Sequence, residues 1–294
     1  MEKSEDDEDI SNTSSELNTP LLKPLVVIEP HKKWVPLDLQ GLWNYRELLF
    51  FLTWRDVKIR YKQTLLGATW AILQPVCMML IFTLFFGRVV GLQAGSEVPY
   101  PLFVLAGLVP WTFFANSVTN GGNSLVSSAG LITKVYFPRL LLPLATALAG
   151  CVDLLLAFLV LFAVMLYYGV MPGMGLVFLP LLIILTFLFA SSVGMWMSAL
   201  NVKYRDVRFA LPFIIQLWLF VSSVIVPVAV LPQKWRWLLL LNPMASIIEG
   251  YRAALFGQPF DWTSLLVATI ITFLALVFSA YSFRHAERQF ADII

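Results

Sequence analysis

Basic side chains gather in two short segments that flank apolar runs of the sequence. Arginine binds phosphate oxygens through a planar fork of donors and lysine through a point charge, so these clusters are suited to a dense anion at a membrane surface. The alternative is that the cations only fix the topology of the chain. The candidates for contact with an anionic lipid substrate are Arg55, Arg60, Lys62, Arg205 and Arg208.

The first of these clusters lies in a segment, residues 42–63, that is predicted to be helical. Leu48, Phe51, Leu52 and Ile59 recur there at helical spacing, and the cations occupy another stripe. A basic helix with leucine and aromatic side chains on its other face lies in the plane of the membrane interface. We therefore expect an amphipathic interface helix whose cations sit at the depth of the lipid phosphates.

Aromatic side chains are a second set of candidates. Their rings stack on the C–H faces of sugars while the polar edges of Trp and Tyr supply hydrogen-bond donors, so such side chains are suited to contact with a glycan. Trp and Tyr also mark membrane interfaces generally, which is the simpler interpretation. The glycan-channel candidates are Trp111, Phe113, Phe114, Trp235, Trp237 and Tyr251.

The sequence lacks groups that would power transport from within the chain. It has no G-x-x-x-x-G-K-[ST] phosphate cradle, so ATP hydrolysis must come from a partner. Asp153 is the one clear ionisable residue inside an apolar run, which is thin support for ion coupling. It is expected to be a packed, hydrogen-bonded acid, with a role in gating or at a dimer interface as the alternative. Cys77, Cys151, His31 and His285 are isolated and predict no metal site.

Composition places most of the chain in a membrane. Hydrophobic residues make up 59% of the 294 positions and charged residues 13%, whereas soluble domains carry about 25% charged residues. A membrane-crossing helix needs about 20 mostly apolar residues. We therefore expect an all-α integral membrane protein with six transmembrane helices. The predicted spans are 65–88, 100–122, 140–167, 175–200, 209–230 and 262–283.

One further apolar run is too short to cross. Trp237 to Ile248 has 12 residues, with Pro232 before it and Pro243 within it. Such a run predicts a re-entrant or interfacial element, at about residues 231–248, that must be packed in protein or line a wet cavity.

The placement of Lys and Arg predicts the orientation. Outside the first 40 residues, twelve basic residues fall on one side of the six spans and four on the other. The richer side is cytoplasmic, which places both termini there. Residues 1–41 are acidic and polar and are expected to form a disordered cytoplasmic tail. Residues 64–290 then form the membrane domain.

Three segments resemble known proteins, and they occur in the expected order. Together they are similar to the ABC-2-type polysaccharide-export permeases, the Wzm-like O-antigen exporters with capsule and teichoic-acid relatives, over about residues 42–290. The segments are Arg55 to Trp70 running into Leu73-Gln74-Pro75, then Asn201 to Arg208, then Leu241-Asn242-Pro243-Met244 leading to Glu249-Gly250-Tyr251-Arg252.

The resemblance implies a multi-pass protein of the bacterial inner membrane that works as a homodimer with two copies of a nucleotide-binding ATPase subunit. It implies export of a polysaccharide, here O-antigen, linked to undecaprenyl diphosphate. ATP and Mg²⁺ would be bound by the partner, with no cofactor in this chain, and nucleic acid is not a partner. The interface helix and the loop after span two would contact the ATPase, and spans one and five would flank a lateral gate. In that loop the coupling candidates are Lys134, Tyr136, Phe137 and Arg139.

Other functions remain open from the sequence. The cargo of an exporter could instead be capsular polysaccharide, teichoic acid or a non-glycan molecule. A membrane enzyme that ligates or polymerises lipid-linked sugar would need acid–base residues in a wet pocket. The predicted outer side offers only Glu97, Glu249 and Asp261 for this, with no histidine. A bare channel or scaffold is the remaining alternative.

The predicted orientation is testable with reporter fusions. Green fluorescent protein, which fluoresces only in the cytoplasm, is expected to fluoresce at both termini, and alkaline phosphatase is expected to be inactive there. A fusion after Gly169, in the break between spans three and four, is the control and should give the opposite pattern. Phosphatase activity at either terminus would contradict the assignment.

Overall fold

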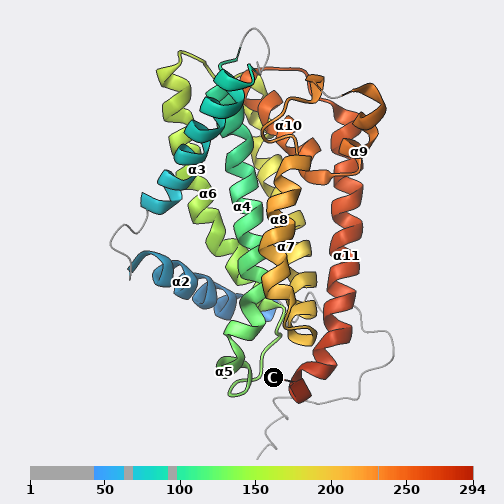
Figure 1. The fold of residues 1–294 in the computed structure, drawn as a ribbon. Helices are drawn as coiled ribbons and strands as arrows, with labels where there is room; N and C mark the ends of the chain where they lie inside the picture. Colours follow the sequence, from blue (N-terminus) through green and yellow to red (C-terminus); the bar gives the residue numbers. More distant parts are fainter. Residues whose placement is uncertain (1–42, 63–68, 92–97, 231, 294) are drawn as a thin grey trace, which may run out of the picture. The chain divides into compact units, whose positions relative to one another are not determined.

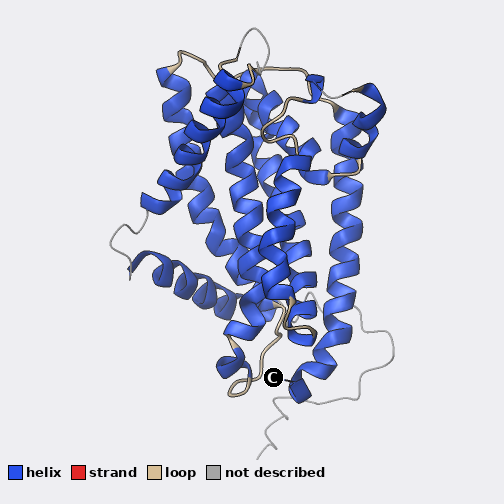
Figure 2. Ribbon diagram, in the orientation of Figure 1, coloured by secondary structure: helices blue, strands red, loops and turns tan. Residues whose placement is uncertain are grey.

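The computed structural model describes residues 43–62, 69–91, 98–230 and 232–293 (Figure 1). Within these ranges every regular element is helical (Figure 2), which confirms the predicted all-α class. The predicted tail, 1–41, lies outside the described residues, as do residues 63–68 before the first span.

Five helical stretches are long and apolar enough to cross a membrane. At a rise of about 1.5 Å per residue, each reaches about 30 Å or more, the thickness of the hydrocarbon core. They are α3 (Thr69–Phe82) with the π-helical η1 (Thr83–Val89), α4 (Tyr100–Ser127), α6 (Leu141–Tyr167), η2 (Met174–Phe178) with α7 (Leu179–Lys203), and the first 26 residues of α11 (Trp262–Ile293).

The sixth apolar helix is shorter than the sequence predicted. The run 209–230 was expected to be one continuous helix, but α8 (Val207–Val221) has 15 residues, which correspond to about 22 Å. The chain turns at Ser222 and Ser223, where Ser223 adopts a positive φ of 56°. A helix can stop in apolar surroundings only if other donors serve the carbonyls that it releases.

Arg252 supplies donors to the carbonyls of the turn that directly follows α8. It lies in α10 (Pro243–Phe256) and is 1% exposed. Its Nη1 donates to the Ser223 carbonyl at 2.8 Å and its Nη2 to the Val224 carbonyl at 2.9 Å. Nη1 also meets Glu249 Oε1 at 2.8 Å, which compensates the buried charge. Arg252 further donates to the Phe103 carbonyl of α4, so one side chain joins three elements.

Asn242 completes the turn from the other side. Its side-chain amide donates to the Val221 carbonyl at 3.1 Å, and its Oδ1 accepts from the Met244 backbone N–H at 3.2 Å as the N-cap of α10. Pro243 follows at the first helical position, where a missing N–H costs nothing.

The segment predicted as one element at 231–248 is therefore divided at Asn242. Before it lie η4 (Gln233–Trp235) and α9 (Arg236–Leu240), and after it α10 continues to Phe256. Pro243, which the sequence alone suggests as a break, begins α10 instead, because its fixed φ suits the first turn of a helix.

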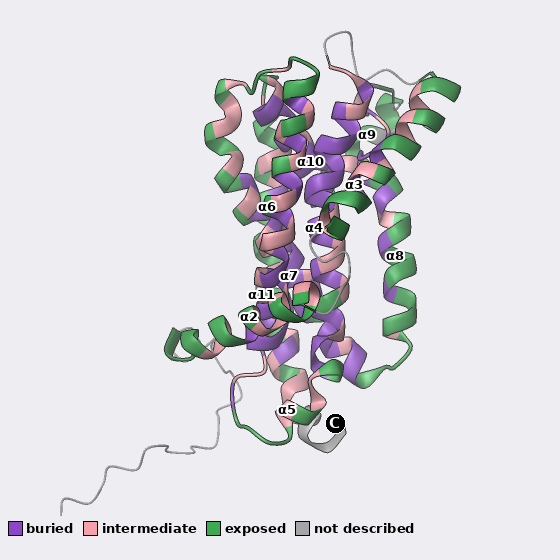
Figure 3. Ribbon diagram, turned by 90° about the vertical axis from the view of Figure 1, so that its left-hand side faces the viewer, coloured by how far each residue is buried: buried purple, intermediate pink, exposed green. Residues whose placement is uncertain are grey.

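α4 is the central helix of the described structure. It contacts α3, α6, α7, α8 and α10, and 78% of its most apolar window is buried, against 11% for the α3–η1 span. Figure 3 shows the contrast between buried α4 and largely exposed α8. Against α7 the backbones come close, since a Cβ on Gly121 would lie 3.4 Å from the Gly194 Cα. Small residues permit such approach between membrane helices.

The helix predicted at 42–63 is present as α2 (Arg46–Lys62) and runs across the direction of α4 and α6 (Figure 1). Its predicted apolar stripe is divided, however. Leu52 is buried and Leu48 packs beside it in a cluster with α6 and α11, whereas Phe51 and Ile59 are 66% and 57% exposed. The stripe is divided because only one side of α2 packs against the rest of the described protein.

Replacing Arg252 tests whether it supports the end of α8. Arg252→Met should lower the free energy of unfolding by about 3–5 kcal/mol, because Glu249 and the carbonyls of Phe103, Ser223 and Val224 lose the guanidinium in an apolar interior. The thermal unfolding midpoint of the purified protein measures this. Arg88→Met, at an exposed arginine of η1, is the matched control and should leave the midpoint unchanged. Equal effects of the two changes would contradict the role of Arg252.

Candidate functional site

A cavity of about 390 Å³ opens between α2, α3, α4 and α6. The long apolar helices α3, α4 and α6 contribute polar side chains to it, and α2 contributes two more. The polar lining consists of Arg60 and Tyr61 from α2, Gln74 from α3, Thr112, Asn116 and Asn120 from α4, and Asp153 from α6. Trp70 and Phe113 supply aromatic faces to the same cavity. It is the richest polar group that the described part of the spans contains, so we take it as the candidate site.

Asp153 joins α2 to α6 on one wall of the cavity. Arg60 Nη1 donates to Asp153 Oδ2, and the Tyr61 hydroxyl donates to Asp153 Oδ1. The side chains of Arg60 and Asp153 are 25% and 22% exposed, so the pair is partly shielded from water. Burial, and next the hydrogen bond to Asp153, raise the pKa of Tyr61 above its ordinary value. Tyr61 therefore stays protonated and keeps donating to the carboxylate, and Asp153 has the hydrogen-bonded surroundings that the sequence predicted.

A polar stripe on α4 forms the opposite wall. Thr112, Asn116 and Asn120 are four residues apart and so lie on one face of the helix. The Thr112 hydroxyl is satisfied by its own helix, donating to the Leu108 carbonyl. The amides of Asn116 and Asn120, and that of Gln74 on α3, form no hydrogen bond with any described residue, and all three are at least partly exposed.

Several predicted glycan-channel aromatics pack inside the chain. Phe114 stacks on Phe189 with centroids 5.3 Å apart and meets the edge of Trp218 at 5.1 Å. Trp111 packs beside Phe114 and is 4% exposed. Tyr251 is fully buried, with its hydroxyl 3.1 Å from Thr186 Oγ1.

The remaining aromatic candidates differ in position. Phe113 is nearly buried but borders the cavity. Trp237, in α9, is 55% exposed. The side chain of Trp235 lies outside the described residues. Contact of any of the six with glycan stays a prediction.

The five predicted phosphate-binding cations occupy two places. Arg55, Arg60 and Lys62 are on α2, while Arg205, in the link between α7 and α8, and Arg208, in the first turn of α8, are both exposed. Arg55 meets Asp56 at 2.9 Å, and the Arg208 guanidinium lies 4.7 Å from the centroid of the Phe209 ring. Of these five cations, Arg60 is the one that forms an ion pair with an acid on another helix, Asp153 of α6.

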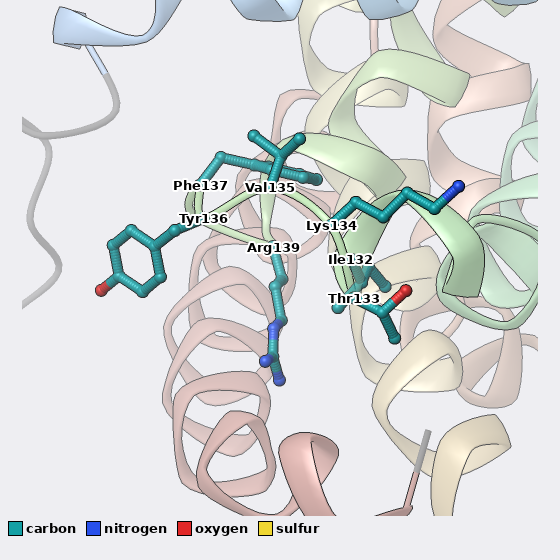
Figure 4. Close-up of a pocket in the computed structure, with 7 residues that line it drawn as sticks. All are labelled: Ile132, Thr133, Lys134, Val135, Tyr136, Phe137 and Arg139. Carbon is teal, nitrogen blue, oxygen red and sulfur yellow. The ribbon is translucent and has the colours of Figure 1, made fainter.

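The predicted coupling residues lie in the loop between α5 (Ala129–Ile132) and α6. The loop borders a second cavity of about 210 Å³, and Figure 4 shows Lys134, Tyr136 and Arg139 extending in different directions from it. Phe137 is buried, and Arg139 donates to the Glu287 backbone carbonyl of α11 at 3.1 Å. Tyr136 is 92% exposed. Two residues therefore anchor the loop while Tyr136 and Lys134 project from it.

Two features were missed by sequence reasoning. Glu249 and Arg252 were counted as loop charges, although their spacing of three residues on an apolar helix is the signal of a buried pair. The Asn116 and Asn120 stripe was passed over inside span two, although side-chain amides four residues apart in an apolar run are expected to face water or a partner.

Comparison with known proteins decides the family. The sequence pattern of ABC-2 type transporters matches residues 47–256, which include the cavity, the α5–α6 loop and the turn that Arg252 supports. The chain belongs to the ABC-2 type transporter family. The resemblance inferred from the three sequence segments is confirmed, and the chain is a multi-pass permease of an ABC-2 exporter. An ABC-2 permease is a transport subunit and works with an ATPase partner.

Individual relatives extend over most of this ABC-2 permease. It is 29% identical over 260 residues to an O-antigen export system permease protein RfbA of Myxococcus xanthus, covering 87% of this chain and 98% of the relative. A Klebsiella pneumoniae protein of the same name is 30% identical, with 82% and 94% covered. The polysialic acid transport protein KpsM of Escherichia coli is 23% identical, with 79% and 91% covered.

The contact between α2 and α6 can be tested at Asp153. In Asp153→Asn the neutral amide should pair poorly with Arg60, so we expect a loss of about 1–3 kcal/mol of stability and faster backbone hydrogen exchange in residues 46–62. Mass spectrometry of the exchanged, purified permease measures the second effect. Asp206→Asn, at an exposed acid of the α7–α8 link, is the control. Unchanged exchange in α2 would show that the pair does not hold the helix.

Proposed function

We propose that this permease is the membrane half of an exporter that moves a polysaccharide linked to undecaprenyl diphosphate, namely O-antigen, out of the cytoplasm. The observation that carries the proposal is that the chain aligns with 94–98% of the length of two permeases named for O-antigen export. Capsular polysaccharide is the second candidate, because KpsM aligns with 91% of its length at lower identity.

The working unit is a pair of these chains with two ATPase subunits in the bacterial inner membrane. α8 is the sixth span in this proposal, the segment 231–248 is re-entrant, and both termini are cytoplasmic. The exposed apolar side chains of α3 and α8 support pairing with a second copy, since Leu80, Ile81 and Phe213 have no described partner surface that covers them. α2 lies in the membrane interface, with its exposed Phe51 and Trp54 in lipid.

The loop between α5 and α6 transmits the motion of the ATPase. Tyr136 and Lys134 project from it and make the contact, while Phe137 and Arg139 fix the loop to α6 and α11. Because the anchors are buried or hydrogen-bonded, a push on Tyr136 moves those helices rather than the loop alone.

The diphosphate of the substrate binds the exposed cations. Arg205 in the α7–α8 link and Arg208 in the first turn of α8 offer forks, and Lys62 at the end of α2 supports them. Arg55 and Arg60 are left out of this set because Asp56 and Asp153 compensate their charges. Trp237 is the aromatic candidate that is exposed and so remains available to the glycan, whereas Phe113 borders the cavity with only 3% of its surface exposed.

Reconstitution in proteoliposomes tests the proposal. The purified permease alone should not hydrolyse ATP, and together with the ATPase subunit encoded beside it should move lipid-linked glycan inward in inside-out vesicles. The double change Arg205→Gln and Arg208→Gln should lower that rate at least about tenfold, because each lost charged hydrogen bond is worth about 1.5–3 kcal/mol.

Arg236→Gln, at an exposed arginine of α9, is the matched control and should transport at the unchanged rate. ATP hydrolysis by the permease alone, or absence of glycan movement in the assembled complex, would refute the function. A complex that moves polysialic acid and rejects neutral O-antigen would favour the second candidate.

A further inference from the structure

Three unpaired side-chain amides face the cavity between α2, α3, α4 and α6. Asn116 and Asn120 stand one turn apart on α4, and Gln74 reaches the cavity from α3. None of the three forms a hydrogen bond with a described residue. A carboxamide in an apolar helix is costly unless water or a ligand meets it. Three of them around one cavity therefore indicate a polar occupant.

The charge of the cavity limits what the occupant can be. Among the described residues that line it, Arg60 and Asp153 are the charged ones, and they are paired with each other. The described lining thus has no net charge, so it is unsuited to a diphosphate, which needs uncompensated cations or several backbone donors. Each amide both donates and accepts hydrogen bonds, and this suits a neutral molecule with many hydroxyl groups.

Aromatic faces complete the lining. Trp70 of α3 is 54% exposed, and Phe113 of α4 borders the same space. A pyranose ring offers an apolar C–H face to such a ring while its hydroxyls point sideways toward donors and acceptors. The small residues Ala71, Gly150 and Ala157 leave room between the walls. The volume of about 390 Å³ is that of a small-ligand pocket.

We propose that this cavity is a binding subsite for an uncharged pyranose unit of the glycan. Asn116, Asn120 and Gln74 hydrogen-bond the sugar hydroxyls, and Trp70 holds a ring face, while Phe113 closes the wall behind the cavity. The pair of Arg60 and Asp153 positions the α2–α6 wall. The inference rests on the proposed function, since it names where in the chain the neutral part of an exported polymer is recognised.

Removal of the α4 amides is the first test. In the assembled complex, Asn116→Leu with Asn120→Leu should weaken binding of isomaltohexaose, a neutral probe, about tenfold and leave binding of inorganic pyrophosphate unchanged. Thr119→Val is the matched control, because it removes a hydroxyl from the same turn of α4 that bonds to Ala115 and does not line the cavity. It should bind both probes as the unaltered complex does. Equal loss of isomaltohexaose binding in the control would overturn the subsite.

Photocrosslinking gives a second measurement that does not depend on stable amide variants. A photoreactive residue replaces Ala71 in the cavity, or Leu155 on an exposed face of α6, and tritiated lipid-linked glycan is supplied during ATP-driven export. Label attached at position 71 and absent at 155 supports the subsite.

Failure of the subsite and failure of the proposed function give different results. Crosslinks from position 71 only to membrane lipid or to a second copy of the chain, in a complex that exports glycan, would overturn the subsite and leave the proposed function standing. A complex that exports no glycan would refute the proposed function and the subsite with it.

Discussion

Backbone carbonyls that leave a helix in apolar surroundings need donors, and the fold of this permease depends on how Arg252 supplies them. One guanidinium serves the Ser223 and Val224 carbonyls, the Phe103 carbonyl of α4 and the carboxylate of Glu249. The close fit leaves no space beside it, since a Cβ on Gly107 would lie 2.8 Å from Arg252 Nη2. Because of this arrangement α8 can end after 15 residues and the chain can return through α9 and α10.

A second ion pair, between Arg60 and Asp153, joins α2 to α6. Asp153 holds the last turn of α2 against α6 through Arg60 and Tyr61, while the apolar cluster around Leu52 holds the middle of the helix. α2 is thus fixed to the helix that follows the α5–α6 loop. A displacement of that loop is transmitted to α2 as well as to α6, which links the two segments that the family resemblance assigns to the ATPase contact.

The sequence predicted the spans better than it predicted the turns between them. Long apolar runs locate α3, α4, α6, α7 and α11 because membrane thickness sets a length that apolar residues must fill. The early end of α8 and the start of α10 at Pro243 depend on hydrogen bonds from residues 20 to 30 positions away, which a linear pattern does not show.

The candidate site was predicted in part. Asp153 and Arg60 were singled out separately, but their pairing joins residues 93 positions apart. Aromatic character alone could not separate Phe114, packed in the core, from Phe113, which borders the cavity one position earlier. A single step along a helix turns a side chain by about 100°, so the neighbours of each ring come from other helices.

The contact between Gly121 and Gly194 limits how this permease can change shape. At this crossing no side chain stands between α4 and α7, and elsewhere Phe114 stacks on Phe189 between the same two helices. Sliding one of them past the other would disrupt both contacts. The α3–η1 span, only 11% of whose apolar window is buried within the chain, has fewer such contacts to lose. A movement within one chain is therefore less costly at α3 than between α4 and α7.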